Sequence, residues 1–463
     1  MSISVESSSF RDPSGFIFRR DGVLYRQVNN VYKEDYDYLI SSGLYDTLTR
    51  FGMMVSHNEV DVGYADSDNV YRVLCPERVE TISYPYEWCF SQLKDAALLM
   101  LRIQRIALAH GMTLKDCSAY NIQFVKGSPM LIDTLSFEKY QEGTPWGAYK
   151  QFCQHFLAPL ALMAYKDVRL SQLLRIHMDG IPLDLANTLL PLRTWFSLPL
   201  LLHIHLHSRS QKYYAGRGMS GKILRKGIGM TSLLGLIDSL KSCVGELKWH
   251  PKSTEWESYY EDDSYSPEAI THKVQMVSDF LRRVRPTVVW DLGANTGLFS
   301  RSASGKRIHT VSFDVDPVCV EINYLAVRGR GETNILPLLL DLTNPSPGIG
   351  WENKERTPIW ERSRADTIMV LALVHHLAIA NNIPLDRVAR FLSGICDTLI
   401  IEFVPKSDPK VQKLLSTRKD VFPNYTQEAF EEEFSKLFRI REQVGIKDSQ
   451  RTLYLMGSWR DVA

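Results

Sequence analysis

The sequence predicts an α/β protein in two parts: a doubly wound, mostly parallel sheet in the C-terminal half, preceded by an α+β domain with a helical lobe. In the C-terminal half, apolar runs of strand length alternate with helical segments, which is the pattern of a doubly wound sheet. In the N-terminal half, a hairpin pattern precedes a long helix and a mainly helical region. The length of 463 residues exceeds one average domain. We therefore expect domains over residues 1–250, with the helical lobe over about 166–250, and over residues 255–463.

Composition and charge are those of a globular protein without a disulfide framework. Hydrophobic residues make up 44% and charged residues 23%, which is ordinary, and the formal net charge of +1 gives no reason to expect nucleic acid as a partner. Seven cysteines without a close CxxC pair argue against disulfides and zinc. The N-terminus lacks a secretory pattern, and the most apolar stretch, residues 198–206, is shorter than the roughly 20 residues of a spanning helix. We expect a cytoplasmic protein without a transmembrane segment, which leaves peripheral membrane contact open.

The first elements are a hairpin and a helix. Apolar runs around Asp21-Gly22 predict a hairpin over residues 15–28, because Asp-Gly between two such runs favours a tight turn. Strand-like pieces follow near residues 71–74 and 79–83. Apolar residues at helical spacing then predict a helix over residues 91–109.

Three polar residues follow this helix at distinctive positions. Asp116 lies in a loop, Asn121 comes five positions later (121 − 116 = 5), and Asp133 ends a strand after a predicted hairpin. Over about residues 15–165, this order resembles the core of protein-kinase-like folds. The resemblance implies that Asp116 orients an attacking hydroxyl as the base, while Asn121 and Asp133 hold Mg²⁺ on the phosphates of ATP.

The same region departs from the kinase pattern. It lacks a GxGxxG loop, and Ser14-Gly15 is the nearest candidate for a phosphate cover. Arg26 stands where that family has its phosphate-binding Lys, and Thr134-Leu135 follows Asp133 in place of Phe-Gly. A domain that holds substrate without transferring phosphate therefore stays open beside an active kinase.

Two basic patterns in the helical region invite a binding interpretation. His203, His205 and His207 alternate with apolar residues, and no acidic or cysteine partner lies nearby in sequence to complete a metal site. We expect packing roles for them. The basic, glycine-rich residues 217–226 predict a solvated loop, with an acidic substrate or lipid headgroup as the alternative.

The C-terminal half opens with an amphipathic helix predicted over residues 267–284, starting at a serine and a proline. Lys273 on this helix could reach a cofactor carboxylate, although a solvated helix face is the default expectation. The aromatic residues just before it, at 256–265, fit either an interdomain seam or the cover of a ligand pocket.

A strand over residues 288–292 then runs into a glycine-rich turn. Asp291, Gly293, Asn295 and Gly297 form an Asp-x-Gly-x-Asn-x-Gly pattern. Glycine suits a sharp turn that approaches a ligand closely, and the start of the following helix offers free N–H donors.

Acidic residues also follow the next two predicted strands. Asp314 comes 314 − 291 = 23 residues after Asp291, where an acid can accept both ribose hydroxyls of a nucleotide-type cofactor. Asp341-Leu342 follows the third strand. The strands that we expect after the turn cover residues 309–313, 335–340, 365–372 and 398–403, with a final antiparallel pair at 437–444 and 451–456.

Over about residues 265–463 this succession resembles the Rossmann-like class I S-adenosylmethionine (SAM) methyltransferases. A dehydrogenase would share the first loop and the ribose acid, but Asp341-Leu342 and the sequence around His375 fit methyltransferases better. The resemblance implies that SAM is the cofactor and that Asp341 and Leu342 read the adenine edge. His375, His376 and Glu402 are candidate acids or bases at strand ends, with packing or helix capping as the alternative for the histidines.

The acceptor is constrained mainly by what is missing. No Asn-Pro-Pro-Tyr motif follows the fourth strand, which weakens a DNA or amide acceptor. Kinase-like and methyltransferase modules are joined in bacterial proteins that modify saccharides, so the resemblance implies O-methylation of a small-molecule, glycan or lipid-linked acceptor that the kinase-like half positions. The alternatives are a bifunctional kinase–methyltransferase using ATP and Mg²⁺, and a non-catalytic SAM-binding scaffold.

Overall fold

The computed structural model describes residues 3–65, 68–208, 229–250, 266–416 and 419–459. The chain forms two compact units. Unit 1 comprises Met1–His250 together with Ser346–Pro358, and unit 2 comprises Pro251–Pro345 with Ile359–Ala463. The short segment Ser346–Pro358 is thus encoded within the predicted C-terminal domain but packs in unit 1, which the sequence patterns did not indicate.

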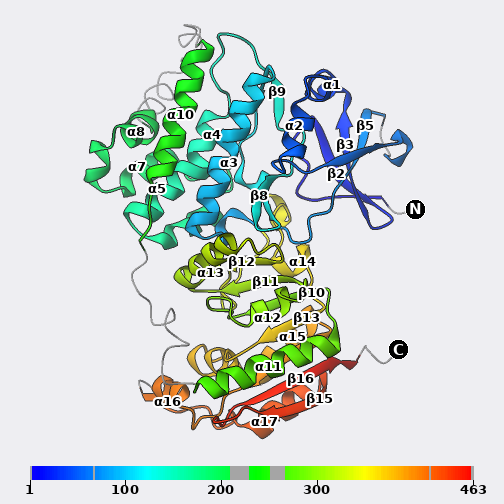
Figure 1. Cartoon of the computed structure of the whole chain (residues 1–463), viewed down its shortest axis with the longest axis vertical. Helices are drawn as coiled ribbons and strands as arrows, with labels where there is room; N and C mark the ends of the chain where they lie inside the picture. The colour runs from blue at the N-terminus through cyan, green and yellow to red at the C-terminus, as the bar shows by residue number, and fades with distance from the viewer. Residues whose placement is uncertain (1–2, 66–67, 209–228, 251–265, 417–418, 460–463) are drawn as a thin grey trace. The chain divides into compact units, whose positions relative to one another are not determined.

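Unit 1 begins with a five-stranded antiparallel sheet (Figure 1). Its strands lie in the order β1-β2-β3-β5-β4 and have the bounds Ile3–Val5, Gly15–Arg20, Val23–Asn29, Val70–Pro76 and His57–Val60. The predicted hairpin is confirmed as β2–β3. Asp21 and Gly22 both have positive φ, at 51° and 82°, as a tight hairpin turn requires. Helices α1 (Lys33–Ser41) and α2 (Leu44–Arg50) follow β3.

The prediction of a strand near residues 79–83 is wrong. This stretch pairs with no strand among the described residues. At Ser83 the backbone pairs with a side chain, because Gln123 Oε1 accepts the N–H of Ser83 at 2.7 Å and Gln123 Nε2 donates to the Ser83 carbonyl at 2.9 Å. At this residue a buried glutamine takes the place of a neighbouring strand.

The long predicted helix is α3, Phe90–Ala109, and it precedes two short antiparallel pairs. These pairs are β6–β9 and β7–β8, and their strands cover Met112–Leu114, Phe137–Lys139, Ile122–Val125 and Ser128–Leu131. The β7–β8 hairpin turns at Lys126 and Gly127, both with positive φ. The loop between β6 and β7 therefore carries Asp116, and the residues after β8 carry Asp133.

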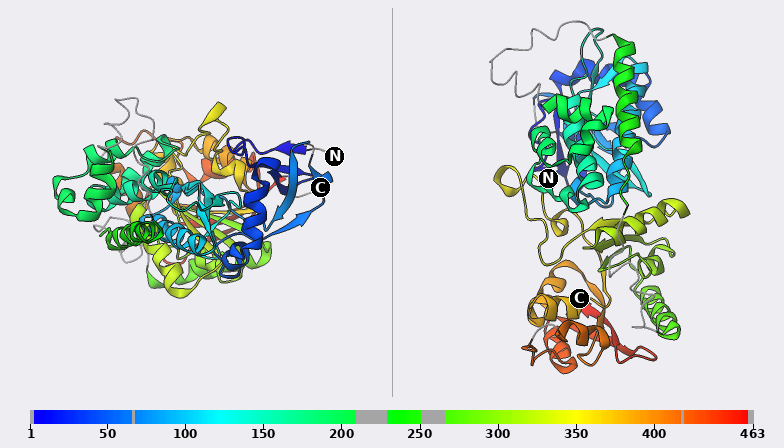
Figure 2. Two further views of the ribbon diagram at one scale, coloured as in Figure 1. Left: turned by 90° about the horizontal axis from the view of Figure 1, so that it is seen from above. Right: turned by 90° about the vertical axis from the view of Figure 1, so that its left-hand side faces the viewer.

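The described residues of unit 1 from Tyr149 to Glu246 are mainly helical. Its helices are α4 (Tyr149–Phe152), α5 (Ala158–Tyr165), α6 (Leu173–Ile176), α7 (Leu183–Leu189), α8 (Leu198–Leu200) and α10 (Met230–Glu246). Helix α10 runs beside α3 (Figure 2), where Arg105 pairs with Asp238 and Lys94 Nζ donates to the carbonyl of Gly245 at 2.8 Å. The basic residues 217–226 and the aromatic residues 256–265 lie outside the described residues.

Unit 2 is built on a seven-stranded sheet, which confirms the doubly wound α/β prediction. The order is β12-β11-β10-β13-β14-β16-β15, with bounds Ile335–Leu339, His309–Asp314, Val288–Leu292, Thr367–Val370, Thr398–Phe403, Thr452–Ser458 and Phe438–Gly445. The first five are parallel, while β16 runs antiparallel to both β14 and β15. The chain order reverses on either side of β10, which makes its carboxyl end the switch point where such sheets bind ligands.

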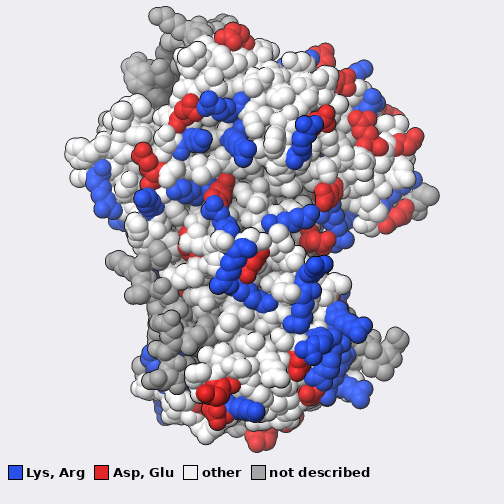
Figure 3. Space-filling view, viewed as in Figure 1, with Lys and Arg blue, Asp and Glu red and all other residues white. Residues whose placement is uncertain are grey.

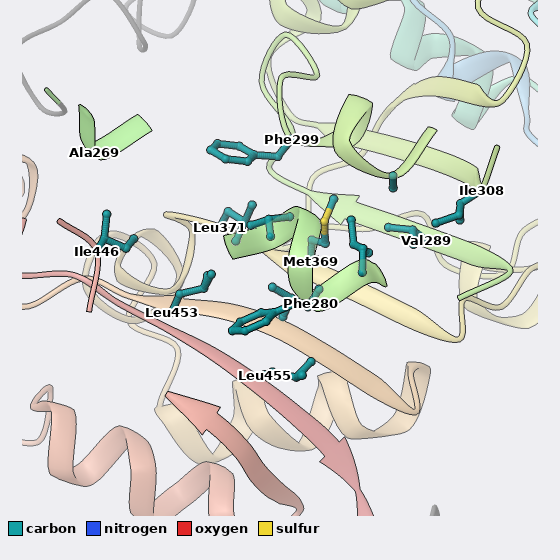
Figure 4. Packing of buried hydrophobic residues seen from close by; sticks show 14 residues of the cluster. Ala269, Phe280, Val289, Phe299, Ile308, Met369, Leu371, Ile446, Leu453 and Leu455 are labelled. Atoms are coloured by element: carbon teal, nitrogen blue, oxygen red, sulfur yellow. The ribbon is translucent and has the colours of Figure 1, made fainter. Parts of the chain in front are cut away.

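Helices complete unit 2. They are α11 (Pro267–Val284), α12 (Ser300–Ser304), α13 (Pro317–Arg330), α14 (Ile359–Arg362), α15 (Leu385–Ile395), α16 (Pro409–Ser416) and α17 (Gln427–Ser435). As predicted, α11 starts at a serine, whose side chain accepts the N–H of Ala269. Phe280 of α11 and Phe299 pack with Val289, Met369 and Leu453 in one buried cluster on the sheet (Figure 4).

The surface carries charges of both signs. Figure 3 shows Lys and Arg interspersed with Asp and Glu over the viewed face, with one denser basic group on unit 2. Among the described residues, no helix combines the length and apolar character needed to cross a bilayer.

Candidate functional sites

The turn after β10 contains two glycines in the left-handed backbone region, each packed closely against side chains of unit 2. Gly293 and Gly297 adopt φ of 75° and 83°, which favours glycine. A Cβ at Gly297 would lie 2.5 Å from the Asn323 side chain, and one at Gly293 would lie 3.2 Å from Leu373. The N–H groups of Gly293 and Ala294 both donate to the Phe313 carbonyl at 2.9 Å, which fixes the turn against β11.

Asp291 is the next-to-last residue of β10, just before this turn. Its carboxylate is buried and accepts the Ser300 hydroxyl at 2.6 Å. Burial raises the pKa of Asp291 to about 6, against the lowering effects of Ser300 and Lys273. The carboxyl group is therefore held in place beneath the turn by the first residue of α12.

Asp314 lies at the neighbouring strand end and is joined to the same turn. Its carboxylate accepts the N–H of Asn295 at 2.7 Å and that of Asp316 at 2.9 Å. Burial raises the pKa of Asp314 to about 6. Asp316 instead caps α13 by accepting the N–H of Val318. The structure thus brings the predicted ribose acid to the glycine turn.

Asp341 and Leu342 follow β12, next to β11. Asp341 accepts both the N–H and the hydroxyl of Thr343, at 2.8 and 2.6 Å, and both predicted residues remain partly exposed. The N–H of Leu340 donates to the Asp314 carbonyl at 2.9 Å. Three acids therefore lie at or just after the carboxyl ends of the adjacent strands β10, β11 and β12, and Asp314 is hydrogen-bonded to the glycine turn.

The default expectation of a solvated Lys273 is wrong. Its side chain is buried, and Nζ lies 2.5 Å from Glu402 Oε2. Burial lowers the pKa of Lys273, and Glu402 counteracts that effect. Arg451 lies 3.6 Å from Glu402 and binds Asp408 through two hydrogen bonds of 2.6 and 3.0 Å. Glu402 is consequently a member of a buried charge network and is poorly placed to act as an acid or base.

Sequence patterns missed Arg451 and Asp408. Glu402 lies within a strand whose other residues are mostly apolar, and a buried charge of this kind needs a partner of opposite charge. Arg451, directly before the apolar run of β16, is a candidate partner that the sequence alone could have indicated.

The two candidate histidines differ in environment. His375 is fully buried, and neither ring nitrogen has a hydrogen-bond partner among the described residues. Burial, followed by the charges of His376, Arg451 and Lys273, holds the pKa of His375 well below its usual value. His376 is partly exposed, with its ring centroid 4.1 Å from that of His375.

In unit 1 the three residues of the kinase-like pattern come together. Asn121 Nδ2 donates to Asp116 Oδ2 at 3.1 Å and lies 3.4 Å from Ser136 Oγ, which donates to Asp133 Oδ2 at 2.6 Å. Burial and the charge of Asp133 raise the pKa of Asp116. Arg26, the residue at the lysine position, pairs with Asp133 at 2.5 Å.

This set fits Mg²⁺ poorly. Hard cations need several oxygen ligands with free lone pairs. Here the groups facing Asp133 are donors: the Arg26 guanidinium, the Ser136 hydroxyl and the N–H of Leu135 at 3.1 Å.

The histidines of the helical region have packing roles, as expected. His203 bonds Tyr149 and Ser239 at 2.8 and 2.9 Å, and His205 bonds Thr194 and Asn187 at 3.0 and 2.6 Å. No group of three metal-binding side chains occurs within the part of the chain that the structure describes.

Strand order and strand-end acids together define a class I SAM-dependent methyltransferase fold joined to a kinase-like domain. No protein-family model matches the chain. The chain belongs to the family of the nodulation protein NoeA of Rhizobium meliloti (strain 1021), to which it is 34% identical over 460 residues, 97% of this chain and 95% of that protein.

Solved structures resemble parts of the chain. The bifunctional kinase–methyltransferase WbdD matches with a TM-score of 0.32 and 17% identity over 43% of this chain and 41% of its own. The N-methyltransferase NodS of Bradyrhizobium japonicum WM9 matches with a TM-score of 0.31 and 10% identity over 42% of this chain and 98% of its own.

Proposed function

We propose that this protein is a SAM-dependent methyltransferase that methylates an oxygen of a saccharide, lipid-linked or small-molecule acceptor. The observation that carries the proposal is the placement of Asp291, Asp314 and Asp341 at the carboxyl ends of three adjacent strands, with Asp314 bonded to the glycine turn at residues 293–297. In this proposal Asp291 supports the amino acid end of SAM, Asp314 accepts the ribose hydroxyls, and Asp341 with Leu342 reads the adenine.

The bound cofactor supplies an electrophilic methyl group. The residues of the chain bind and orient it, and one of them accepts the proton that the acceptor hydroxyl loses. His376 suits that role best, because it is partly exposed, whereas His375 is buried and Glu402 is paired with Lys273.

A cavity in unit 1 supports a role of the kinase-like half in holding the acceptor. It has a volume of about 550 Å³ and is bordered by the polar residues Gln154, Arg175, His177, Asp179 and Asn353. Apolar residues, among them Ile176 and Ile349, complete the lining, and a mixture of hydrogen-bonding and apolar side chains suits a saccharide, which has hydroxyl groups and apolar ring faces.

Calorimetry with SAM tests the cofactor assignment. We expect wild type to bind SAM. Asp314→Asn should lose at least about tenfold in affinity, because a hydrogen bond to a charged group contributes about 1.5–3 kcal/mol. Glu361 is an exposed acid of α14, and Glu361→Gln should bind SAM as wild type does. If wild type shows no binding, the proposal fails.

Turnover tests the catalytic step separately. Methyl incorporation from labelled SAM into extracts should identify the acceptor, and His376→Gln should then lower kcat by roughly 10²-fold with SAM affinity unchanged. SAM binding without any incorporation would favour the non-catalytic scaffold.

A further inference from the structure

The carboxylate of Asp133 in unit 1 is fully engaged by groups of the chain itself. Oδ1 faces the Arg26 guanidinium at 2.5 Å and accepts the N–H of Leu135 at 3.1 Å. Oδ2 accepts the Ser136 hydroxyl at 2.6 Å. A metal ion at this carboxylate would have to displace these donors, of which the guanidinium carries a full positive charge.

The Arg26–Asp133 pair is held in a poorly solvated place. Each side chain is only 11% exposed. Arg26 lies within β3, where its backbone is paired with Ile17 of β2 on one side and with Leu74 of β5 on the other, so the sheet fixes the point from which its side chain reaches Asp133. Separating a buried ion pair leaves an uncompensated charge, which is costly.

The other two residues of the kinase-like pattern are also committed to internal hydrogen bonds. Asp116 Oδ1 accepts the N–H of Ser118 and the amide of Gln151, both at 2.8 Å, and Oδ2 accepts the amide of Asn121. Asn121 Nδ2 also donates to the Ser136 hydroxyl at 3.4 Å, which in turn donates to Asp133. All three residues act as members of one hydrogen-bonded network.

We propose that the Arg26 guanidinium is the resident cation of this site and excludes a divalent metal from Asp133. Two cations would otherwise compete for one carboxylate at contact distance, in surroundings of low dielectric constant. The kinase-like domain then has no metal-assisted phosphoryl transfer to perform, and Asp133 and Asp116 position Arg26 and the loop around Asn121. This inference concerns unit 1 alone and does not depend on methyl transfer by unit 2.

Mn²⁺ titrations followed by electron paramagnetic resonance test the proposal on the full chain, with and without ATP. We expect wild type to show no saturable Mn²⁺ site at Asp133, so wild type and Asp133→Asn should give the same titration. Arg26→Met should gain one Mn²⁺ site, and Arg26→Met/Asp133→Asn should lose it again. The matched control is Arg72→Met, on β5 of the same sheet, which exchanges a more exposed arginine and should gain no site.

A wild-type Mn²⁺ site that Asp133→Asn abolishes would overturn the proposal, as would Mg²⁺-dependent ADP release that Asp116→Asn abolishes. A folded Arg26→Met protein without a new Mn²⁺ site would also overturn it, because Arg26 would then not be what excludes the metal. Circular dichroism establishes folding. If Arg26→Met does not fold, the wild-type titration tests the proposal on its own. A second variant, Arg26→Lys, keeps the positive charge and should also bind no Mn²⁺ at Asp133.

Discussion

At the scale of single residues, the edge of the unit 2 sheet that we propose for SAM carries two carboxyl groups with raised pKa values. Burial raises the pKa of both Asp291 and Asp314 to about 6. Each carboxylate is held by neighbouring donors, Ser300 in one case and the backbone of Asn295 in the other. Both carboxyl groups therefore change charge near pH 6.

This acidity predicts a pH-dependent affinity for SAM. SAM carries a sulfonium and an ammonium group, so ionised Asp291 and Asp314 favour its binding. We expect affinity to fall as pH drops through about 6, by up to about tenfold per pH unit for each carboxylate that must ionise. Calorimetry across this range measures the effect, and a flat profile would contradict it.

The free energy of unfolding without SAM should depend on pH in the opposite direction to the affinity for SAM. A carboxyl pKa raised from 3.8 to about 6 means that the folded state binds more protons in this interval, so the contribution of Asp291 to stability decreases as pH rises through it. The difference in unfolding between wild type and Asp291→Asn over this range isolates that contribution.

Gly297 gives a prediction for the backbone. Gly297→Ala places a Cβ at positive φ and 2.5 Å from the Asn323 side chain, so we expect at least about a tenfold loss of SAM affinity, since strain of this kind costs on the order of 1–3 kcal/mol. Gly329→Ala, within α13 and with open space around it, is the matched control and should bind SAM as wild type does.

At the scale of elements, a buried charge network joins α11 to the sheet of unit 2. Lys273 of α11 pairs with Glu402 of β14, and Arg451, just before β16, approaches Glu402 and binds Asp408. The amphipathic pattern placed α11 correctly, because apolar spacing depends on the helix itself. It could not place Lys273, because burial of a lysine depends on a partner that lies 129 residues away.

Breaking this network should destabilise unit 2. Lys273→Met leaves Glu402 buried without its closest cation, and we expect a loss of about 3–5 kcal/mol in the free energy of unfolding. The double change Lys273→Met/Glu402→Gln should recover part of the loss, because it removes both charges. Urea unfolding measures both variants, and equal stabilities of the single variant and wild type would contradict the prediction.

The elements that could be predicted from the sequence are those that depend on local signals. The strands of unit 2 and the β2–β3 hairpin were predicted because apolar runs and the Asp21-Gly22 turn are local signals. Residues 79–83 were misassigned because they pair with no described strand, and the backbone of Ser83 bonds instead to a distant side chain, Gln123. The acids at strand ends were found from sequence, but their hydrogen bonds to Ser300 and Asn295 depend on how the turn folds.

At the scale of the whole molecule, the segment Ser346–Pro358 departs from a simple succession of domains. It follows β12 in sequence yet belongs to unit 1. There, Glu355 is buried and accepts two hydrogen bonds from Arg11, at 2.5 and 2.9 Å, and the Arg356 guanidinium lies 4.4 Å from the centre of the Tyr120 ring. No local pattern in these residues indicated that they would pack there.

Glu355 gives the prediction at this scale. Its hydrogen bonds with Arg11 lower the pKa of Glu355, so their stabilisation is present at neutral pH and is lost as pH falls below the usual range of a glutamate. We expect Glu355→Gln to reduce the free energy of unfolding of unit 1 by about 1–3 kcal/mol at neutral pH, and by less in acid. Thermal unfolding compares it with Glu352→Gln, an exposed acid of the same segment that should behave as wild type.

The placement of Ser346–Pro358 also bears on inheritance. A single recombination event near residue 250 would join the first half of one gene to the second half of another. Arg11 would then contact a segment 346–358 from the other gene, which evolved beside a different surface. Exchange of halves between distant relatives is therefore penalised at the level of folding. The two modules are expected to descend as one gene and to change together at Arg11, Tyr120 and the segment that contacts them.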